Sequence, residues 1–102
     1  MRKSIQQGDC ILVPVSNIPK DAKQIPFSGI VLKGEGINTH ELKDAESVSA
    51  YEHNGVLYLR LNSDNSIVHQ EHGISNVQCG DWMRIIEREY DYETEEARQT
   101  MD

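Results

Sequence analysis

The sequence has 102 residues, of which 37% are hydrophobic, and its 17 acidic side chains outnumber 10 basic ones, for a formal charge of −7. This length fits one domain, no apolar run is long enough to span a membrane, and the acidic balance argues against a protein that binds a nucleic-acid backbone. Polar residues follow the basic Met1-Arg2-Lys3, so no secretory signal is predicted, and two cysteines far apart in the sequence fit a reducing, cytoplasmic compartment.

The first third of the chain predicts short strands separated by loops. Residues 9–15 are rich in branched apolar side chains and predict a strand that lies at a sheet edge, or ends, near its proline. Residues 17–26 hold two prolines among charged side chains and predict a surface loop. Residues 27–33 predict a short buried strand, which Gly34-Glu35-Gly36 ends with a turn or bulge.

The middle of the chain carries the clearest strand signals. Residues 37–46 leave the choice of structure open, and 39–45 could form one helical turn. A strand at 47–51 leads to Asn54-Gly55, which predicts a hairpin because both residues tolerate the positive φ of a type I′ turn. Residues 56–61 (VLYLRL) alternate, so their three leucines share one face of a strand.

The remaining strand signals complete an all-β pattern. A turn at 63–66 precedes strands at 67–70 and 74–77, and a turn at 79–81 precedes a last strand from Trp82 to Ile86 that continues toward Tyr90. Six to eight strands with closely spaced turns predict a small antiparallel β-barrel or sandwich over residues 1–92. A domain of this size is marginally stable alone, which favours self-association through an exposed strand edge.

Negative charge concentrates at the C-terminal end. Residues 87–102 hold seven acids and two arginines, a net −5, whereas residues 1–86 hold ten acids and eight bases, a net −2. Residues 93–102 predict an acidic tail, in which the lack of apolar periodicity favours a flexible end over a short helix.

Two readings are open for the segment that leads into this tail. On a strand, Arg88, Tyr90 and Tyr92 share one face and four acids share the other. In the first, the segment as a whole is a docking surface for a basic partner, with Arg88, Tyr90 and Tyr92 as partner-binding residues. The acids would instead protect an edge strand from pairing with other edges, and this second reading is favoured.

The densest cluster of chemistry-bearing residues is His69-Gln70-Glu71-His72. A bulge or turn near His72 would bring its imidazole and that of His69 together, and imidazole with carboxylate suits zinc, iron, manganese or nickel. His40 would supply a third ligand, with Glu35 and Glu71 as further ligands. Small cupin-type β-barrels place ligands on facing strands in a comparable way, and the spacing from Gly34 to His40 echoes the start of their first motif, although Leu42 stands where its second histidine would be.

A structural reading of the histidines carries more weight than metal ligation. Histidines at hairpin edges are usually solvated or hydrogen-bonded to nearby carboxylates, and His53 beside Asn54-Gly55 fits that description. For His69 and His72 we also favour a structural or surface role over a divalent transition metal as cofactor.

Nucleophilic catalysis finds little support in the sequence. Cys10 lies in a strand predicted to be buried, where thiols are generally inert, and Cys79 lies beside a turn. A nucleophile elbow, a phosphate-binding loop and a dinucleotide fingerprint are all absent from the sequence. No catalytic residue is assigned, and a non-enzymatic protein is favoured over an enzyme.

Taken together, these segments resemble a family of small proteins encoded by bacteria and their phages, for which no activity is established. In the middle element, compared with that family's pattern, the segment is one residue longer, Thr39 replaces a glycine and Leu42 replaces a second histidine. The resemblance covers most of the chain and is carried by the following pieces in order: Gln7-Gly8-Asp9 with the apolar run to Val15, Ile18-Pro19, Val31-Leu32, Gly34-Glu35 with His40, Leu57-Tyr58-Leu59, His69 with Glu71-His72, Gly80-Asp81-Trp82, Arg88-Glu89-Tyr90, and Arg98 with Asp102.

Three functions follow as hypotheses. The first is a non-enzymatic β-barrel accessory protein, encoded by a phage or prophage, that acts in the bacterial cytoplasm, forms homo-oligomers and binds a host protein, phage protein or small ligand. The second is a cupin-like metal-binding module or metal-dependent enzyme that uses His40, His69 and His72. The third is an acidic inhibitor of a host protein. None of the three binds nucleic acid or a membrane.

Overall fold

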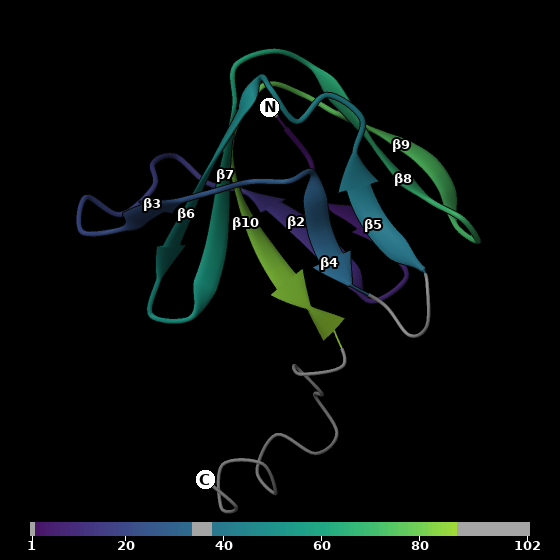
Figure 1. The fold of residues 1–102 in the computed structure, drawn as a ribbon, viewed down its shortest axis with the longest axis horizontal. Helices are drawn as coiled ribbons and strands as arrows, with labels where there is room; N and C mark the ends of the chain where they lie inside the picture. Colours follow the sequence, from purple (N-terminus) through teal and green to yellow (C-terminus); the bar gives the residue numbers. More distant parts are fainter. Residues whose placement is uncertain (1, 34–37, 88–102) are drawn as a thin grey trace, which may run out of the picture.

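Two antiparallel sheets face each other in the computed structural model, which describes residues 2–33 and 38–87 (Figure 1). One sheet has six strands in the order β1-β2-β10-β7-β6-β3, and the other has four in the order β4-β5-β8-β9. The sheets do not close into a barrel, so the fold is a sandwich. The strands are β1 (Ile5–Gln7), β2 (Cys10–Pro14), β3 (Lys23–Ile25), β4 (Ile30–Lys33), β5 (Thr39–Leu42), β6 (Val48–His53), β7 (Val56–Leu61), β8 (Asn65–His69), β9 (Gly73–Val77) and β10 (Gly80–Ile86).

The β6–β7 hairpin confirms the sequence prediction at its turn. Asn54 and Gly55 have φ angles of 52° and 79°, the positive values that a type I′ turn needs. The two strands pair from Val48 with Leu61 to His53 with Val56. Alternation along β7 places Leu59 and Leu61 in the core.

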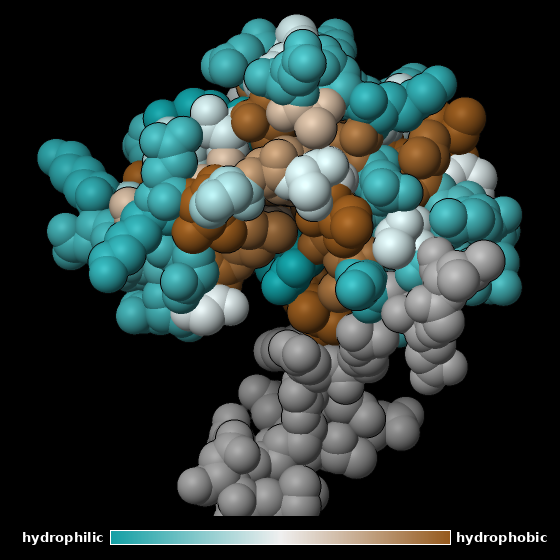
Figure 2. All heavy atoms as spheres, in the orientation of Figure 1, coloured by the Kyte–Doolittle hydropathy of each residue, from teal (hydrophilic) through white to brown (hydrophobic). Residues whose placement is uncertain are grey.

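The core lies between the sheets and is mostly aliphatic. Trp82 on β10 is its largest fully buried side chain, and its indole Nε1 donates a hydrogen bond to the Gln78 carbonyl at 2.9 Å. Figure 2 shows hydrophobic residues in the middle of one face, where the two sheets meet, with hydrophilic residues around them. Burial of the apolar side chains between the two sheets provides the main favourable free energy of folding.

Arg2 fastens the start of the chain to β10. Its guanidinium donates hydrogen bonds to the carbonyls of Asp81 at 2.6 Å and Val15 at 3.0 Å, and lies 5.1 Å from the centre of the Trp82 ring system. Gly80 has a φ of 126°, which residues with a Cβ rarely adopt, and a Cβ there would also displace the Arg2 guanidinium from its place. This arginine therefore has a structural role.

The structure corrects several predicted elements. The ten strands among the described residues exceed the six to eight expected, because β1 and β3 have only three residues each and lack strong apolar signals. β3 lies inside the predicted surface loop. Residues 39–42 form β5 and no helical turn, because alternating His40 and Leu42 are buried against the core. β8 begins at Asn65, inside a predicted turn.

Other predictions are confirmed. β2 ends at Pro14, β9 matches the predicted strand at 74–77, and β10 contains the predicted strand that begins at Trp82. The glycine turn at 34–36 lies outside the described residues, as do Tyr90 and the acidic tail. Within the described part of the chain, no helix is long and apolar enough to cross a bilayer.

Candidate functional site

Two histidines stack inside the sandwich because of the β5–β8 register. Glu41 pairs with Val68 and Leu42 with Ile67, so one step further along the ladder His40 lies opposite His69. Both side chains point inward and are buried, with exposed fractions of 3% and 9%. Their ring centroids are 4.2 Å apart, with 28° between the ring planes.

The turn between β8 and β9 adds a third imidazole to this pair. The His72 ring lies 4.6 Å from that of His69 and 6.2 Å from that of His40, between centroids. It also lies against the β1–β2 turn, where a Cβ at Gly8 would be 2.7 Å from its Nε2. We call His40, His69 and His72 the histidine stack.

Gln7 ties β1 to the histidine stack and to the β8–β9 hairpin. Its buried amide Nε2 donates to the carbonyls of Ile67 at 3.2 Å and Gly73 at 3.1 Å. The Oε1 atom therefore faces Nδ1 of His40, at 2.9 Å. One side chain thus connects an edge of each sheet, since β1 and β9 belong to different sheets.

The hydrogen bonds assign a tautomer to each buried imidazole. Oε1 of Gln7 can only accept, so Nδ1 of His40 carries the proton. In His69, Nδ1 accepts hydrogen bonds from the backbone N–H groups of Glu71 at 3.0 Å and His72 at 3.2 Å. The proton of neutral His69 is therefore on Nε2.

The environment of His40 favours its neutral form. Its pKa is lowered from 6.5 to about 4, mainly by burial and in smaller part by the neighbouring His69 and His72, while Asp9 acts in the opposite direction. A proton on His40 would place a charge inside the sandwich beside two other imidazoles. His40 is thus neutral at neutral pH.

This geometry differs from that of a metal site. A metal needs a nitrogen lone pair from each histidine, whereas in His69 Nδ1 already accepts two N–H groups and Nε2 holds a proton. Among residues 2–33 and 38–87, no group of three or more histidine, cysteine, aspartate or glutamate side chains is arranged to hold a metal ion. The three histidines that the sequence pattern singled out nevertheless lie close together.

The other predicted site residues lie elsewhere. Glu71 is exposed and accepts a hydrogen bond from the Asn38 amide at 3.4 Å. Glu35, Arg88, Tyr90 and Tyr92 lie outside the described residues. Cys10 is buried, as expected, and burial raises the pKa of its thiol to about 12, so it does not form a reactive thiolate at neutral pH.

A second notable feature is the outer edge of the four-stranded sheet, formed by β9. The Ser66 carbonyl accepts a hydrogen bond from the N–H of Lys43, so the backbone polar groups of Ser66 face away from β9. Backbone polar groups alternate in direction along a strand, so those of Ile67 face β9 and pair with Ser75. The N–H and C=O groups of Ile74 and Asn76 consequently point away from β8, on the side of β9 where the sheet has no further strand.

The side chains on this edge are uncharged and partly apolar. Ile74 is 64% exposed, the most exposed large hydrophobic side chain in the described part of the chain. It lies opposite Val68 on the outer face of the sheet. Neither a charged residue nor a proline occurs between Gly73 and Val77. We refer to Gly73–Val77 as the β9 edge.

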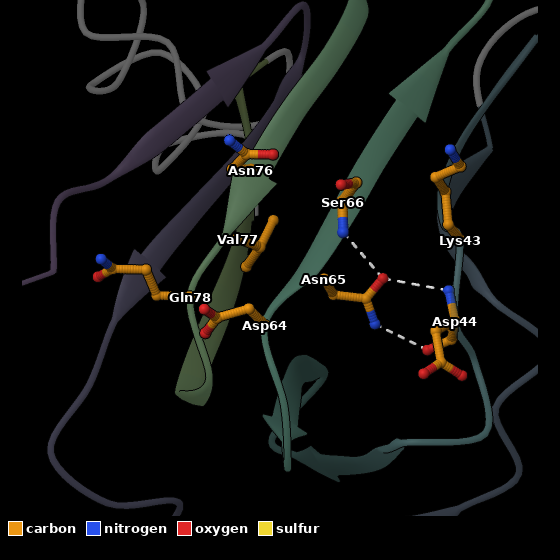
Figure 3. A pocket seen from close by; sticks show the side chains of 8 residues that line it. All are labelled: Lys43, Asp44, Asp64, Asn65, Ser66, Asn76, Val77 and Gln78. Carbon is orange, nitrogen blue, oxygen red and sulfur yellow. Dashed lines mark hydrogen bonds between the residues drawn. The ribbon is translucent and has the colours of Figure 1, made fainter.

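A groove of about 590 Å³ adjoins the C-terminal end of the β9 edge (Figure 3). Asn65 on its floor bonds to the backbone of Asp44 and Ser66, which holds the β5–β8 connection in place. Its lining residues are Lys43, Asp44, Asp64, Asn65, Ser66, Asn76, Val77 and Gln78.

Sequence reasoning anticipated an exposed edge but did not locate this one. The stretch GISNV predicts a strand, yet nothing in it distinguishes an edge strand from a central one. The groove also depends on tertiary structure, because its lining comes from three separate stretches of the chain. Gln7 gave no signal, since a glutamine in a strand is usually exposed.

Comparison with known proteins places the chain in a family. Searches of the curated proteins and of the solved structures found no match. Residues 6–87 match the model of a family described as a domain of unknown function, DUF8820. That stretch includes all ten strands except the first residue of β1. The chain therefore belongs to the DUF8820 family, a family without an assigned activity.

Proposed function

We propose that this protein is a non-enzymatic binding module that takes up an additional strand at the β9 edge. The observation that carries the proposal is the outward direction of the backbone polar groups of Ile74 and Asn76, on a strand without charge or proline. Such an edge forms main-chain hydrogen bonds with any extended segment that reaches it.

The other three sheet edges are less suited to strand addition. β1 and β3 have three residues each, and β3 contains Lys23 and precedes Pro26. β4 ends in Lys33 and has an irregular register between Ile30 and Leu32. Short length, charge, proline and irregular pairing all discourage edge-to-edge association. The β9 edge has none of these protective features.

Contacts around the edge support binding by side chains as well. On the outer face, Ile74 and Val68 form an apolar pair, and a side chain of an added strand would pack against Ile74. Beyond Asn76, the groove offers the carboxylates of Asp44 and Asp64 and the amine of Lys43 to polar side chains. Main-chain pairing would provide affinity, and the groove would provide selectivity.

Amide hydrogen exchange tests this function. In dilute protein the N–H groups of Ile74 and Asn76 should exchange quickly, whereas that of Ser75, which faces β8, should be protected. Extended heptapeptides of alternating valine and threonine should protect the first two amides. Peptides that are N-methylated at alternate residues serve as the control, because they lack the N–H groups needed for pairing.

The N76P variant provides the matched protein control. Its proline removes an N–H that faces outward and leaves the ladder with β8 intact, so the fold should persist while binding is lost. If neither the peptides nor a higher protein concentration protects the amides of Ile74 and Asn76, the proposed function is wrong.

A further inference from the structure

We infer that the strand taken up at the β9 edge is the β9 edge of a second copy of this chain, related by a two-fold axis at Ser75. This inference rests on the proposed function and names its partner. In this arrangement Ile74 of one copy pairs with Asn76 of the other, and the two Ser75 residues face each other. The two four-stranded sheets then form one continuous sheet of eight strands.

The hydrogen-bond pattern of the β9 edge is self-complementary. The outward N–H and C=O groups belong to Ile74 and Asn76, which are equally distant from Ser75. A two-fold axis through Ser75 therefore matches donors with acceptors on both sides and makes Ile74 with Asn76 a hydrogen-bonded pair, twice. An axis at Ile74 would place Ile74 opposite Ile74 of the other copy and leave Asn76 out of this pairing. An axis at Asn76 would do the reverse.

Charge does little to oppose contact between two copies of the chain at this edge. Each copy carries a formal charge of −7, so two copies repel each other over most orientations. Between Gly73 and Val77 the edge has no charged side chain, so within these residues no like charges lie directly opposite each other. The uncharged edge is therefore a surface where two identical acidic molecules approach at low electrostatic cost.

The same arrangement covers the exposed apolar side chain. Ile74 of one copy becomes the diagonal neighbour of Ile74 of the other on the outer face, within reach of its long side chain. The register also carries the His72-Gly73 turn of the second copy alongside Val77 and Gln78, which line the groove. Both features of the candidate interface, the apolar pair and the groove, thus meet the same partner.

Disulfide trapping tests the register. In a C79S background, which removes the exposed native thiol, S75C should form a disulfide-linked dimer on mild oxidation because two facing residues in a non-hydrogen-bonded pair lie close together. N76C is the matched control. It is the more exposed position, so random collisions would cross-link it more readily, whereas in this register it faces Ile74 of the other copy.

Sedimentation provides an independent measurement. The unmodified chain should show a concentration-dependent monomer–dimer equilibrium, and N76P should be a monomer with an unchanged urea midpoint in dilute solution. The inference is overturned if N76C cross-links as well as S75C, or if N76P dimerises like the unmodified chain. A chain that stays monomeric while peptides protect the amides of Ile74 and Asn76 refutes the second copy and leaves the proposed function standing.

Discussion

Gln7 illustrates how much one buried polar side chain contributes at the scale of a residue. Its amide bonds to two carbonyls and to the His40 imidazole. We expect Q7M, which has a similar shape and no amide, to lower the free energy of unfolding by about 3 kcal/mol, since unpaired buried polar groups cost about 1–3 kcal/mol each. Urea denaturation measures this change. The exposed neighbour provides the control, and Q6M should cost less than about 0.5 kcal/mol; equal effects would contradict the role assigned to Gln7.

The buried His40 predicts a pH dependence of stability. Its pKa falls from 6.5 to about 4 on folding, so the unfolded chain binds a proton first as the pH decreases. The free energy of unfolding is therefore highest above about pH 6.5, where His40 is neutral in both states. It decreases as the pH falls to about 4, by about 3 kcal/mol in all.

Urea denaturation across this pH range measures the effect. H40N is the control, because its amide nitrogen occupies a place like that of Nδ1 and can still donate to Gln7, but does not titrate. Its stability should vary less steeply between pH 4 and 6.5. A slope identical to that of the unmodified chain would show that His40 is not the group responsible.

The His69 tautomer predicts how the stack responds to transition metals. With Nδ1 occupied by two backbone N–H groups, His69 has no lone pair to offer, so Zn²⁺ titration by calorimetry should reveal no stoichiometric site in the histidine stack. H69A should leave the titration unchanged. Stoichiometric zinc binding that is lost in H69A would instead establish the metal site that the sequence pattern suggested.

At the scale of elements, the turns on β1–β2 and β8–β9 are coupled through Gly8 and His72. Both Gly8 and Gly55 have positive φ, so alanine at either position should cost about 1–2 kcal/mol in backbone strain. A Cβ at Gly55 has open space, whereas one at Gly8 meets the His72 ring. G8A should therefore cost more than G55A.

A double-mutant cycle checks this coupling. The extra cost of G8A should disappear in an H72A background, which corresponds to an interaction free energy of about 0.5 kcal/mol or more between the two sites. The pair G55A and H72A should be additive. Additivity for G8A and H72A as well would mean that the His72 ring moves aside without cost.

The strands differ in how far local sequence determined them. β7 and its turn were predictable because alternation and Asn54-Gly55 act locally. β1 and β3 were not, because three-residue strands form only where a neighbouring strand is available. The grouping of His40, His69 and His72 was foreseen from residue type, while their stacking depends on the β5–β8 register and their tautomers on Gln7 and on the turn after β8.

At the scale of the whole molecule, net charge predicts a salt dependence of assembly. Two copies at −7 repel each other, and this repulsion decreases as salt shortens the Debye length from about 30 Å at 0.01 M to about 8 Å at 0.15 M. The dimer proposed above should therefore become tighter as sodium chloride is added, as measured by sedimentation equilibrium. A dimer that dissociates with added salt would indicate pairing of opposite charges, in conflict with an uncharged interface.

The position of β10 has a consequence for synthesis of the chain on the ribosome. β10 lies between β2 and β7 and pairs with both, and it carries Trp82. Translation delivers the strands in order, so β1–β2 and β3–β6–β7 emerge as separate groups with open inner edges. They become one sheet only when the last strand leaves the exit tunnel. Until then the nascent chain exposes unpaired strand edges and apolar side chains, the kinds of surface that chaperones recognise.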